Sequence, residues 1–265
     1  MNKMKRINLF EFEDFVWFPN WTRICLTRLI VVMHKILHSS DDLIPLIKRA
    51  LKHSNKNTII DLCSGSGGPM IEVFKNLANV EGKGNVELIL TDLFPDLEMA
   101  SKINHSAIQN LSYKTSPVNA SNVSAELIGV RTMVGSFHHM KPDTARQILK
   151  NAKESKTPIC IYEISDNNFP TFLWWTTIPM IFLMALIITP FVRPLTWKQL
   201  IFTYIIPVIP LFFAWDGAVS NARTYTLEDL GVLLEGLESE DYTWEKGKIK
   251  NKANKIYLLG LPYSC

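Results

Sequence analysis

Short apolar runs alternate with stretches of helical period through the middle of the chain. Five runs have the form of buried strands: 58–62, 86–91, 114–118, 132–134 and 158–164. Three stretches with an apolar stripe of helical period lie between them: 70–80, 97–110 and 142–155. Short, continuously apolar runs are typical of strands buried on both faces of a parallel sheet. The alternation therefore predicts right-handed βαβ units and an α/β fold with a doubly wound, mostly parallel sheet.

Further elements are expected on either side of this core. Residues 10–21 are rich in aromatic side chains, and residues 26–37 carry an apolar stripe that predicts a helix. A second helix is expected after the acidic pair 41–42, because carboxylates suit the start of a helix. Near the other end, 242–249 and 255–261 are predicted to form an antiparallel hairpin that completes a seven-stranded sheet.

The segment 169–215 differs from the rest because it holds two long apolar stretches, 169–192 and 199–215. Each approaches the roughly 20 residues that span a bilayer. Strands are predicted on both sides of the segment, so both of its ends must lie on the same side of a membrane. Prolines in both stretches and a cationic tip between them favour a shallow hairpin over a full crossing. The alternative is a buried helical hairpin that covers the active site or a dimer interface.

Composition and charge narrow the classes of function. The mean hydropathy of +0.08 is high for a wholly soluble enzyme. A net charge of +3, from 28 basic and 25 acidic residues, gives no electrostatic footprint for nucleic acid. The four cysteines form no C-x-x-C pair, which argues against a zinc site or disulfides, and acidic residues at 11, 13 and 14 interrupt any export signal. We therefore expect no nucleic-acid partner, no bound metal and a location on the cytoplasmic side of a membrane.

Residues 58–69 are the most informative segment, because a buried strand runs into a glycine-rich turn that opens a helix. Glycine allows positive φ and a close approach of a ligand to the backbone, and the helix N-terminus presents free N–H groups. This combination is typical of a nucleotide site. A nicotinamide-binding G-x-G-x-x-G would need glycine at the position of Met70, and the G-K-[ST] of a P-loop is absent.

The same segment resembles motif I of class I S-adenosylmethionine-dependent methyltransferases. Asp61, Gly65 and Gly67 match that motif, whereas Cys63 stands where the family most often has its first glycine. The resemblance implies S-adenosylmethionine as the cofactor. It also implies that Asp61 lies near the methionine amine and that Ser64, Gly65 and Gly67 lie against the cofactor.

Two more residues extend the expected cofactor site. Asp92 follows the second predicted strand, where a carboxylate can accept hydrogen bonds from both ribose hydroxyls. Asn119 follows the third predicted strand and resembles the acidic residue that the family places beside the adenine, and its amide oxygen can still accept a hydrogen bond. The resemblance covers about residues 45–168 and 217–265.

Residues 135–140, after the fourth predicted strand, resemble the F-H-H-L type stretch found at this place in many small-molecule methyltransferases. In those enzymes the loop faces the transferred methyl group. The resemblance implies that Phe137 contacts the cofactor and that His138 or His139 is catalytic, because an imidazole can orient a nucleophile or remove its proton. The alternative is that both histidines only bond to the backbone and the cofactor.

The substrate site is expected near the end of the fifth strand and where the apolar segment re-enters the fold. Four residues are candidates: Glu163, Asp216, Arg223 and Tyr225. The guanidinium of Arg223 would suit an anionic group, and residues 226–229 have the form of a capped helix start. His34 and His38 have a spacing that could hold a metal ion, but we expect them on a solvated helix face.

These expectations divide the chain into an N-terminal aromatic and helical segment (1–45), a methyltransferase domain (46–168 and 217–265) and an apolar insert (169–216). The expected function is methyl transfer from S-adenosylmethionine to an apolar or amphipathic small molecule or lipid at the membrane. One alternative is a non-catalytic protein that keeps the cofactor fold and attaches to a membrane or partner through the hairpin. Another is an oxidoreductase on a nicotinamide-binding fold, which Met70 and the histidine stretch disfavour.

Overall fold

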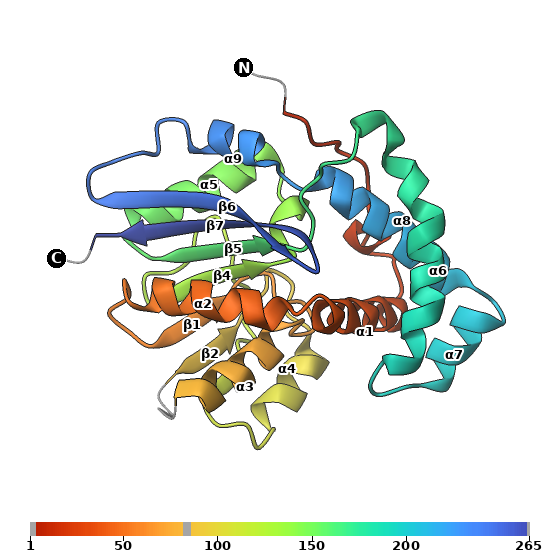
Figure 1. The fold of residues 1–265 in the computed structure, drawn as a ribbon. Helices are drawn as coiled ribbons and strands as arrows, with labels where there is room; N and C mark the ends of the chain where they lie inside the picture. The colour runs from red at the N-terminus through yellow and green to blue at the C-terminus, as the bar shows by residue number, and fades with distance from the viewer. Residues whose placement is uncertain (1–3, 82–85, 264–265) are drawn as a thin grey trace.

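The computed structural model describes residues 4–81 and 86–263 of the chain. In this part of the chain, a sheet of seven strands lies between layers of helices (Figure 1). The strands are β1 (Thr58–Asp61), β2 (Glu87–Leu90), β3 (Leu111–Tyr113), β4 (Val130–Val134), β5 (Ile159–Glu163), β6 (Tyr242–Asn251) and β7 (Ala253–Pro262). Their order is β3-β2-β1-β4-β5-β7-β6, with β7 antiparallel to β5 and β6 and the remaining neighbours parallel.

This strand order confirms the predicted fold class. The chain winds outward from β1 through β2 to β3, and then returns to continue on the other side of β1 through β4 to β5. In such sheets, ligands bind beyond the carboxyl ends of the strands, where the winding direction changes. The antiparallel β7 between β5 and β6 completes the sheet arrangement of class I methyltransferases, which the motif resemblance implied. The hairpin of β6 and β7 is also confirmed.

The third strand lies earlier than predicted. The sequence pattern placed it at 114–118, whereas β3 is Leu111–Tyr113. The expected strand fails at Pro117, which has no N–H to donate to a ladder and restricts the residue before it. The preceding helix, α4 (Leu97–Asn104), also ends earlier than the predicted residue 110, and the Asn104 side chain exchanges two hydrogen bonds with the backbone of Tyr113 at its end.

Helices cover both faces of the sheet and form two apolar cores. On one face α2 (Ser39–Leu51) and α3 (Met70–Glu81) pack with α4 around buried residues such as Ile47 and Phe74. On the other face α5 (Pro142–Glu154) and α9 (Leu227–Leu234) pack around residues such as Leu149 and Leu233. The predicted cap of α9 is present, since the side chains of Thr226 and Asp229 form a reciprocal capping box.

The predicted start of α2 after the acidic pair 41–42 is wrong, because the helix begins before that pair. The helix begins at Ser39 after His38, which has a left-handed backbone, so Asp41 and Asp42 lie in its first turn. Asp42 is buried, accepts a hydrogen bond from the Tyr162 hydroxyl at 3.0 Å and forms an ion pair with buried Lys255. The carboxylate therefore anchors α2 to β5 and β7 and does not cap the helix.

A third group of helices lies beyond the carboxyl ends of the parallel strands, on the right of Figure 1. It contains α1 (Asn20–Ile36) and the insert, which consists of η3 (Thr171–Thr177), α6 (Ile178–Ile188), η4 (Thr189–Phe191), α7 (Trp197–Tyr204) and the first part of α8 (Val208–Arg223). Buried Leu29 of α1 packs with Ile188 of α6 and Phe213 of α8 in one cluster.

The N-terminal segment joins the same group of helices. It includes the short helix η1 (Phe12–Asp14), and the ring of Phe12 lies 4.6 Å from that of Phe212 between centroids. The expected boundary at residue 45 falls inside α2, and the one at residue 216 falls inside α8. Each of these two helices therefore runs across an expected boundary between parts of the chain.

The insert contains the apolar helical stretch that the sequence predicted. Among the described residues, one stretch is long and apolar enough to cross a membrane. It is Phe172–Phe191, and its most apolar 18-residue window has a mean hydropathy of 2.0. Only 17% of that window is buried. The helices α7 and α8 pass the same test only as a pair that is bent by 79°. The structure thus shows an apolar helix whose length and composition permit membrane association.

Candidate active site

The glycine loop joins β1 to α3 through residues with positive φ. The φ angles are 57° at Cys63, 51° at Gly65, 93° at Gly67 and 43° at Gly68. The N–H of Gly67 donates to the Ser64 carbonyl at 2.8 Å, which closes the turn. A methyl group added to Gly65 or Gly68 would meet no heavy atom within 4 Å. The loop therefore presents bare, accessible backbone beside the N-terminus of α3, as a nucleotide site requires.

Cys63 occupies a conformation that glycine adopts more easily. A left-handed backbone costs a residue with a Cβ roughly 1–2 kcal/mol, and β-branched residues fit it least well. We expect Cys63→Gly to leave the Tm within about 2 °C of wild type, and Cys63→Val to lower it by about 4 °C or more. Thermal unfolding followed by circular dichroism measures both. A valine variant as stable as the glycine variant would show that the loop takes another path.

Asp61 lies beneath this loop at the end of β1 and is 4% exposed. Its Oδ1 accepts a hydrogen bond from the Thr132 hydroxyl at 2.7 Å, and its Oδ2 accepts one from the Ser64 hydroxyl at 2.7 Å. Burial outweighs these two hydrogen bonds and raises the pKa of Asp61 to about 7. The structure thus brings the predicted Asp61 and Ser64 together and places a carboxyl group that changes charge near neutral pH under the loop.

Asp92 follows β2 and holds the glycine loop from the other side. Its Oδ2 accepts a hydrogen bond from the Gly65 N–H at 2.9 Å, and its Oδ1 accepts one from the Phe94 N–H at 2.9 Å. The Tyr113 hydroxyl donates to the Gly65 carbonyl at 2.8 Å. Four of the predicted cofactor residues, Asp61, Ser64, Gly65 and Asp92, are therefore linked by hydrogen bonds at one edge of the sheet, beside Gly67.

The other two predicted cofactor residues have local partners. The Oδ1 of Asn119 accepts hydrogen bonds from the backbone and hydroxyl of Ser121 at 2.9 and 2.8 Å. The ring of Phe137 is 1% exposed and packs against the ring of Tyr225, with 5.4 Å between centroids. Phe137 thus anchors the turn that follows β4 in the core, and contact of Asn119 or Phe137 with a cofactor stays a prediction.

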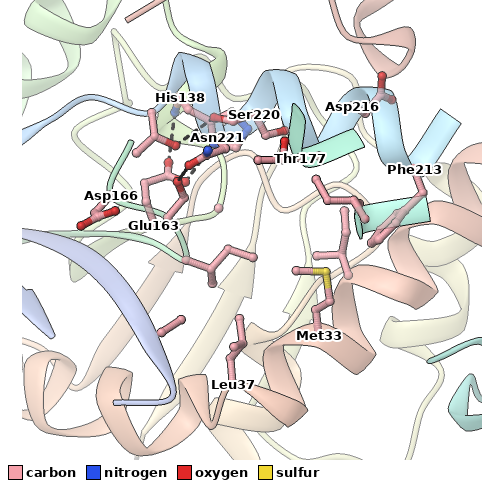
Figure 2. Close-up of a pocket in the computed structure, with 18 of the residues that line it drawn as sticks. Met33, Leu37, His138, Glu163, Asp166, Thr177, Phe213, Asp216, Ser220 and Asn221 are labelled. Atoms are coloured by element: carbon pink, nitrogen blue, oxygen red, sulfur yellow. Dashed lines mark hydrogen bonds and ion pairs between the residues drawn. The ribbon is translucent and has the colours of Figure 1, made fainter. Parts of the chain in front are cut away.

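That turn is the short helix η2 (Phe137–His139), which places His138 over the end of β5. Glu163 accepts hydrogen bonds from the His138 backbone N–H at 3.0 Å and pairs with its Nδ1 at 2.8 Å (Figure 2). Burial would raise the pKa of Glu163, but the charge and hydrogen bonds of His138 outweigh it, so the pKa is lowered. A carboxylate on Nδ1 keeps the proton on that nitrogen and leaves Nε2 as the free acceptor.

His139 faces two carboxylates from the N-terminal segment. Its Nδ1 lies 3.2 Å from Oδ1 of Asp14, and its Nε2 lies 3.7 Å from Oε2 of Glu11. Burial lowers the pKa of His139, but the charge of Glu11 and the hydrogen bond with Asp14 outweigh it and raise the pKa to about 9. The two predicted catalytic histidines are therefore part of one cluster with Glu11, Asp14 and Glu163.

A cavity of about 620 Å³ opens beside this cluster. Figure 2 shows His138, Glu163, Ser220 and Asn221 gathered near one another, while Met33 of α1 and Leu37, the residue after α1, lie away from them. The insert closes the cavity with apolar side chains of α6 and α8: Met180, Ile181, Met184 and Phe213. The arrangement suits an acceptor with a polar group and an apolar body.

The predicted substrate residues divide into two groups. Glu163 and Asp216 line the cavity, and the Oδ1 of Asp216 accepts a hydrogen bond from the Phe12 N–H at 2.7 Å. Arg223 is turned toward the cluster, where its Nη1 lies 2.7 Å from Asp14 and 3.1 Å from Glu11. Its guanidinium thus has protein partners in place of a substrate anion.

Tyr225 lies outside the residues that line the cavity. Its hydroxyl donates to the Met140 carbonyl at 2.7 Å, and the guanidinium of Arg6 lies 4.4 Å from its ring centre. Together with its packing on Phe137, these contacts hold the end of the histidine turn. Its role as a substrate residue stays a prediction.

Sequence reasoning missed several residues that line the cavity. His34 was expected on a solvated helix face, and this is wrong, because the residue is 4% exposed and lines the cavity, whereas His38 is exposed. Burial lowers the pKa of His34 to about 4, so its imidazole is neutral at physiological pH. Glu11 also lines the cavity, and only the three-dimensional fold brings it to the histidines.

No protein-family model and no curated protein matches the sequence. Several solved structures resemble it in overall arrangement at low identity. The plantazolicin methyltransferase BpumL in complex with SAH has a TM-score of 0.48 and 10% identity over 92% of this chain and 98% of that one. The methyltransferase domain of bacterial-CtHen1-C has a TM-score of 0.49 and 10% identity over 86% of this chain and 98% of that one. The mitomycin 7-O-methyltransferase MmcR has a TM-score of 0.47 and 11% identity over 86% of this chain and 54% of that one.

Proposed function

We propose that the chain is an S-adenosylmethionine-dependent methyltransferase that acts on an apolar or amphipathic small molecule or lipid at a membrane surface. One observation carries this proposal. The glycine loop with Asp92, the cluster of His138 and Glu163, and a largely apolar cavity all lie beyond the carboxyl ends of the strands of a class I sheet. A cofactor on the loop and an acceptor in the cavity would therefore be neighbours.

The residues around the loop fit the adenosine and methionine parts of this cofactor. The open backbone at Gly65 and Gly68 leaves room for a close approach, and the carboxylate of Asp92 is placed to accept hydrogen bonds from ribose hydroxyls. Asp61 lies below the loop, where its charged form would attract the methionine amine. When bound, S-adenosylmethionine supplies a sulfonium methyl group that an acceptor can attack.

The cavity supports the acceptor side of the proposal. Its apolar walls would hold the body of the acceptor and exclude water, while His138 Nε2 could remove a proton from the attacking group. The N-terminal segment borders the polar end, because Glu11 and Glu13 line the cavity and the Phe12 N–H donates to Asp216 at 2.7 Å. This segment therefore helps to align the acceptor with the histidine turn.

The test is incubation of the purified protein with methyl-labelled S-adenosylmethionine and a membrane lipid extract. We expect labelled, extractable product and S-adenosylhomocysteine in equal amounts. Mass spectrometry of the labelled product identifies the acceptor. Tight binding of the cofactor without product from any extract would instead support the non-catalytic alternative, in which the fold serves attachment.

The pKa of Asp61 predicts how cofactor binding depends on pH. Binding favours the charged carboxylate, so with a pKa of about 7 the affinity should rise by about tenfold between pH 6 and pH 8. The stability of the free protein should follow the opposite trend. The unfolded pKa is about 3.9, so the contribution of Asp61 to stability is fully present below that value and is lost as the pH rises through 7.

Titration calorimetry at several pH values and denaturant unfolding measure these two trends. Asp61→Asn should abolish both, because an amide does not titrate. An affinity of the wild type that does not change over this pH range would remove Asp61 from the cofactor site.

The outer face of the insert supports contact with a membrane. Residues 169–192 contain no charged side chain. The inner face of α6 packs on α1 through Ala185 and Ile188, yet the outer face of η3, α6 and η4 carries exposed apolar residues: Phe172, Trp175, Met180, Leu183, Ile187 and Phe191. A helix that is apolar on all sides needs an apolar medium on the face that the protein leaves uncovered. We propose that this face lies in the cytoplasmic leaflet as a shallow hairpin, with Trp17 of the N-terminal segment beside it.

Ile187→Glu should lower the affinity for phosphatidylcholine vesicles by about tenfold or more, because burying an isoleucine side chain contributes roughly 1.5–3 kcal/mol. Ile187 is 68% exposed, so the substitution leaves the core intact. Ile128→Glu is the matched control, since Ile128 is 47% exposed and far from the insert in sequence. Cosedimentation with vesicles measures both. A wild-type protein that stays in the supernatant would support the buried-hairpin or dimer alternative.

A further inference from the structure

Three metal-binding side chains from two distant segments meet at the polar end of the cavity. Glu11 belongs to the N-terminal segment, and His138 and His139 belong to the turn after β4. We infer that Glu11, His138 and His139 form a binding site for a divalent transition-metal ion, and that Zn²⁺ is the ion their donor atoms suit best. The spacing in sequence hides such a site, which is why no metal was expected.

The distances suit one ion shared by three ligands. His138 Nε2 lies 3.9 Å from Oε1 of Glu11, and His139 Nε2 lies 3.7 Å from Oε2. The ligand atoms all lie within 4.8 Å of one another. Two ligands at about 2.0–2.1 Å from Zn²⁺ in tetrahedral geometry lie roughly 3.4 Å apart, so side-chain shifts of about 1 Å complete the site.

The partners of the ligands are arranged as in metal centres. A histidine that binds a metal through one ring nitrogen generally donates the N–H of the other to a carboxylate, a backbone carbonyl or water. This hydrogen bond fixes the tautomer and the ring orientation. Here the Nδ1 of His138 pairs with Glu163 at 2.8 Å, and the Nδ1 of His139 pairs with Asp14 at 3.2 Å. Both histidines therefore turn Nε2 toward Glu11.

One of the ligand atoms has unmet bonding capacity. Among the described residues, His138 Nε2 is buried without a hydrogen-bond partner, and the His138 side chain is 8% exposed. Oε1 of Glu11 forms an ion pair with Arg223 Nη1 at 3.1 Å. A buried polar atom without a partner costs free energy that a bound ion would recover. This observation points to a ligand independently of the cluster itself.

The charges around the cluster leave a place for a cation. Three carboxylates, Glu11, Asp14 and Glu163, contact the two imidazoles. The guanidinium of Arg223 is an ion-pair partner of Glu11 and Asp14, and that of Arg6 donates to the His138 carbonyl at 2.7 Å. With neutral imidazoles these five charged groups carry a net negative charge, which an ion between Glu11 and the histidines would balance.

Donor chemistry selects the kind of ion. Imidazole nitrogen suits zinc and its transition-metal neighbours, whereas Mg²⁺ and Ca²⁺ prefer oxygen ligands. Three protein ligands leave coordination positions open, and all three ligands line the cavity. An oxygen of the acceptor could fill an open position, and this step rests on the proposed function. In that complex His138 Nε2 is a ligand and no longer a free base.

The experiment is equilibrium dialysis of metal-stripped protein against Zn²⁺ in the absence of S-adenosylmethionine, with metal content measured by mass spectrometry. We expect one equivalent of Zn²⁺ per chain and no retention of Mg²⁺. Glu11→Gln and His138→Gln should weaken Zn²⁺ binding by about 100-fold, and Asp14→Asn by about tenfold through the orientation of His139. His38→Gln is the control, because exposed His38 also pairs with a carboxylate, Asp41, at 3.1 Å.

A second measurement on the wild type does not depend on how the variants fold. Co²⁺ should give the visible absorption of a four- or five-coordinate ion, and Zn²⁺ should remove it. Absence of stoichiometric Zn²⁺ binding, a thiolate-to-cobalt absorption band, or equal binding by folded Glu11→Gln and wild type would each overturn the inference. None of these readouts requires methyl transfer.

Discussion

Asp92→Ala is expected to weaken S-adenosylmethionine binding by on the order of 100-fold, since hydrogen bonds to a charged group contribute roughly 1.5–3 kcal/mol each. We expect the Asp92 carboxylate to have two roles. It accepts a hydrogen bond from the Gly65 N–H at 2.9 Å and so shapes the loop, and we propose that it also accepts from the ribose hydroxyls. Titration calorimetry with purified variants measures the loss.

Asp96→Ala is the matched control for this substitution. Asp96 is also a half-buried aspartate after β2, and its side chain accepts from the Met99 N–H as the N-cap of α4. Its loss should lower stability by about 1 kcal/mol and leave cofactor affinity within about threefold. Equal cofactor binding by Asp92→Ala and the wild type would remove the ribose role from Asp92.

His138→Ala is expected to lower kcat by about 10²- to 10⁴-fold while the cofactor Kd stays within about threefold. The imidazole lines the cavity and is held by Glu163, so we expect it to act on the acceptor and not on the adenosine. His139→Ala should also lower kcat, because the same cluster holds its ring. Single-turnover methyl transfer, once an acceptor is in hand, separates the two effects.

His105→Ala serves as the control for the histidine variants. His105 is exposed at the end of α4, where its Nδ1 bonds to the Ser101 carbonyl at 2.8 Å. Its kcat should equal that of the wild type. Unchanged turnover in the His138 and His139 variants and in the double variant would make both histidines structural residues of the turn.

The parts of the candidate site that the sequence predicted share one property: each can be recognised from residues that are adjacent in the sequence. The glycine loop is a short segment, and Asp92 follows its strand directly, so strand pattern and turn chemistry were enough to place them. Cys63, which stands where the methyltransferase motif most often has glycine, adopts a φ of 57°. The third strand was misplaced because its pattern is weak and because β3 is only three residues long.

The polar end of the cavity could not be read from the sequence, because it depends on contacts between distant segments. Glu11 and Asp14 meet His139 across more than 120 positions of the chain. No periodicity or motif in either segment encodes that contact. His34 was misplaced for the same reason, since the face of α1 that it occupies becomes buried only when the cavity forms around it.

The insert shows a third limit of the sequence pattern. Its apolar stretches predicted affinity for an apolar surrounding, but not which face would meet protein. In the structure Ala185 and Ile188 of α6 pack on α1, while Leu183 and Ile187 face outward. One helix therefore closes the cavity and also exposes an apolar face, and hydropathy alone does not separate these two faces.

The measurement that tests the central claim most directly is calorimetric titration of the purified chain with S-adenosylmethionine and, separately, with NAD. The account predicts saturable binding of one S-adenosylmethionine per chain, weakened in Asp92→Ala, and no binding of NAD because Met70 replaces the third glycine of a nicotinamide motif. Saturable binding of NAD, or no heat from S-adenosylmethionine at protein concentrations that would detect micromolar affinity, would contradict it.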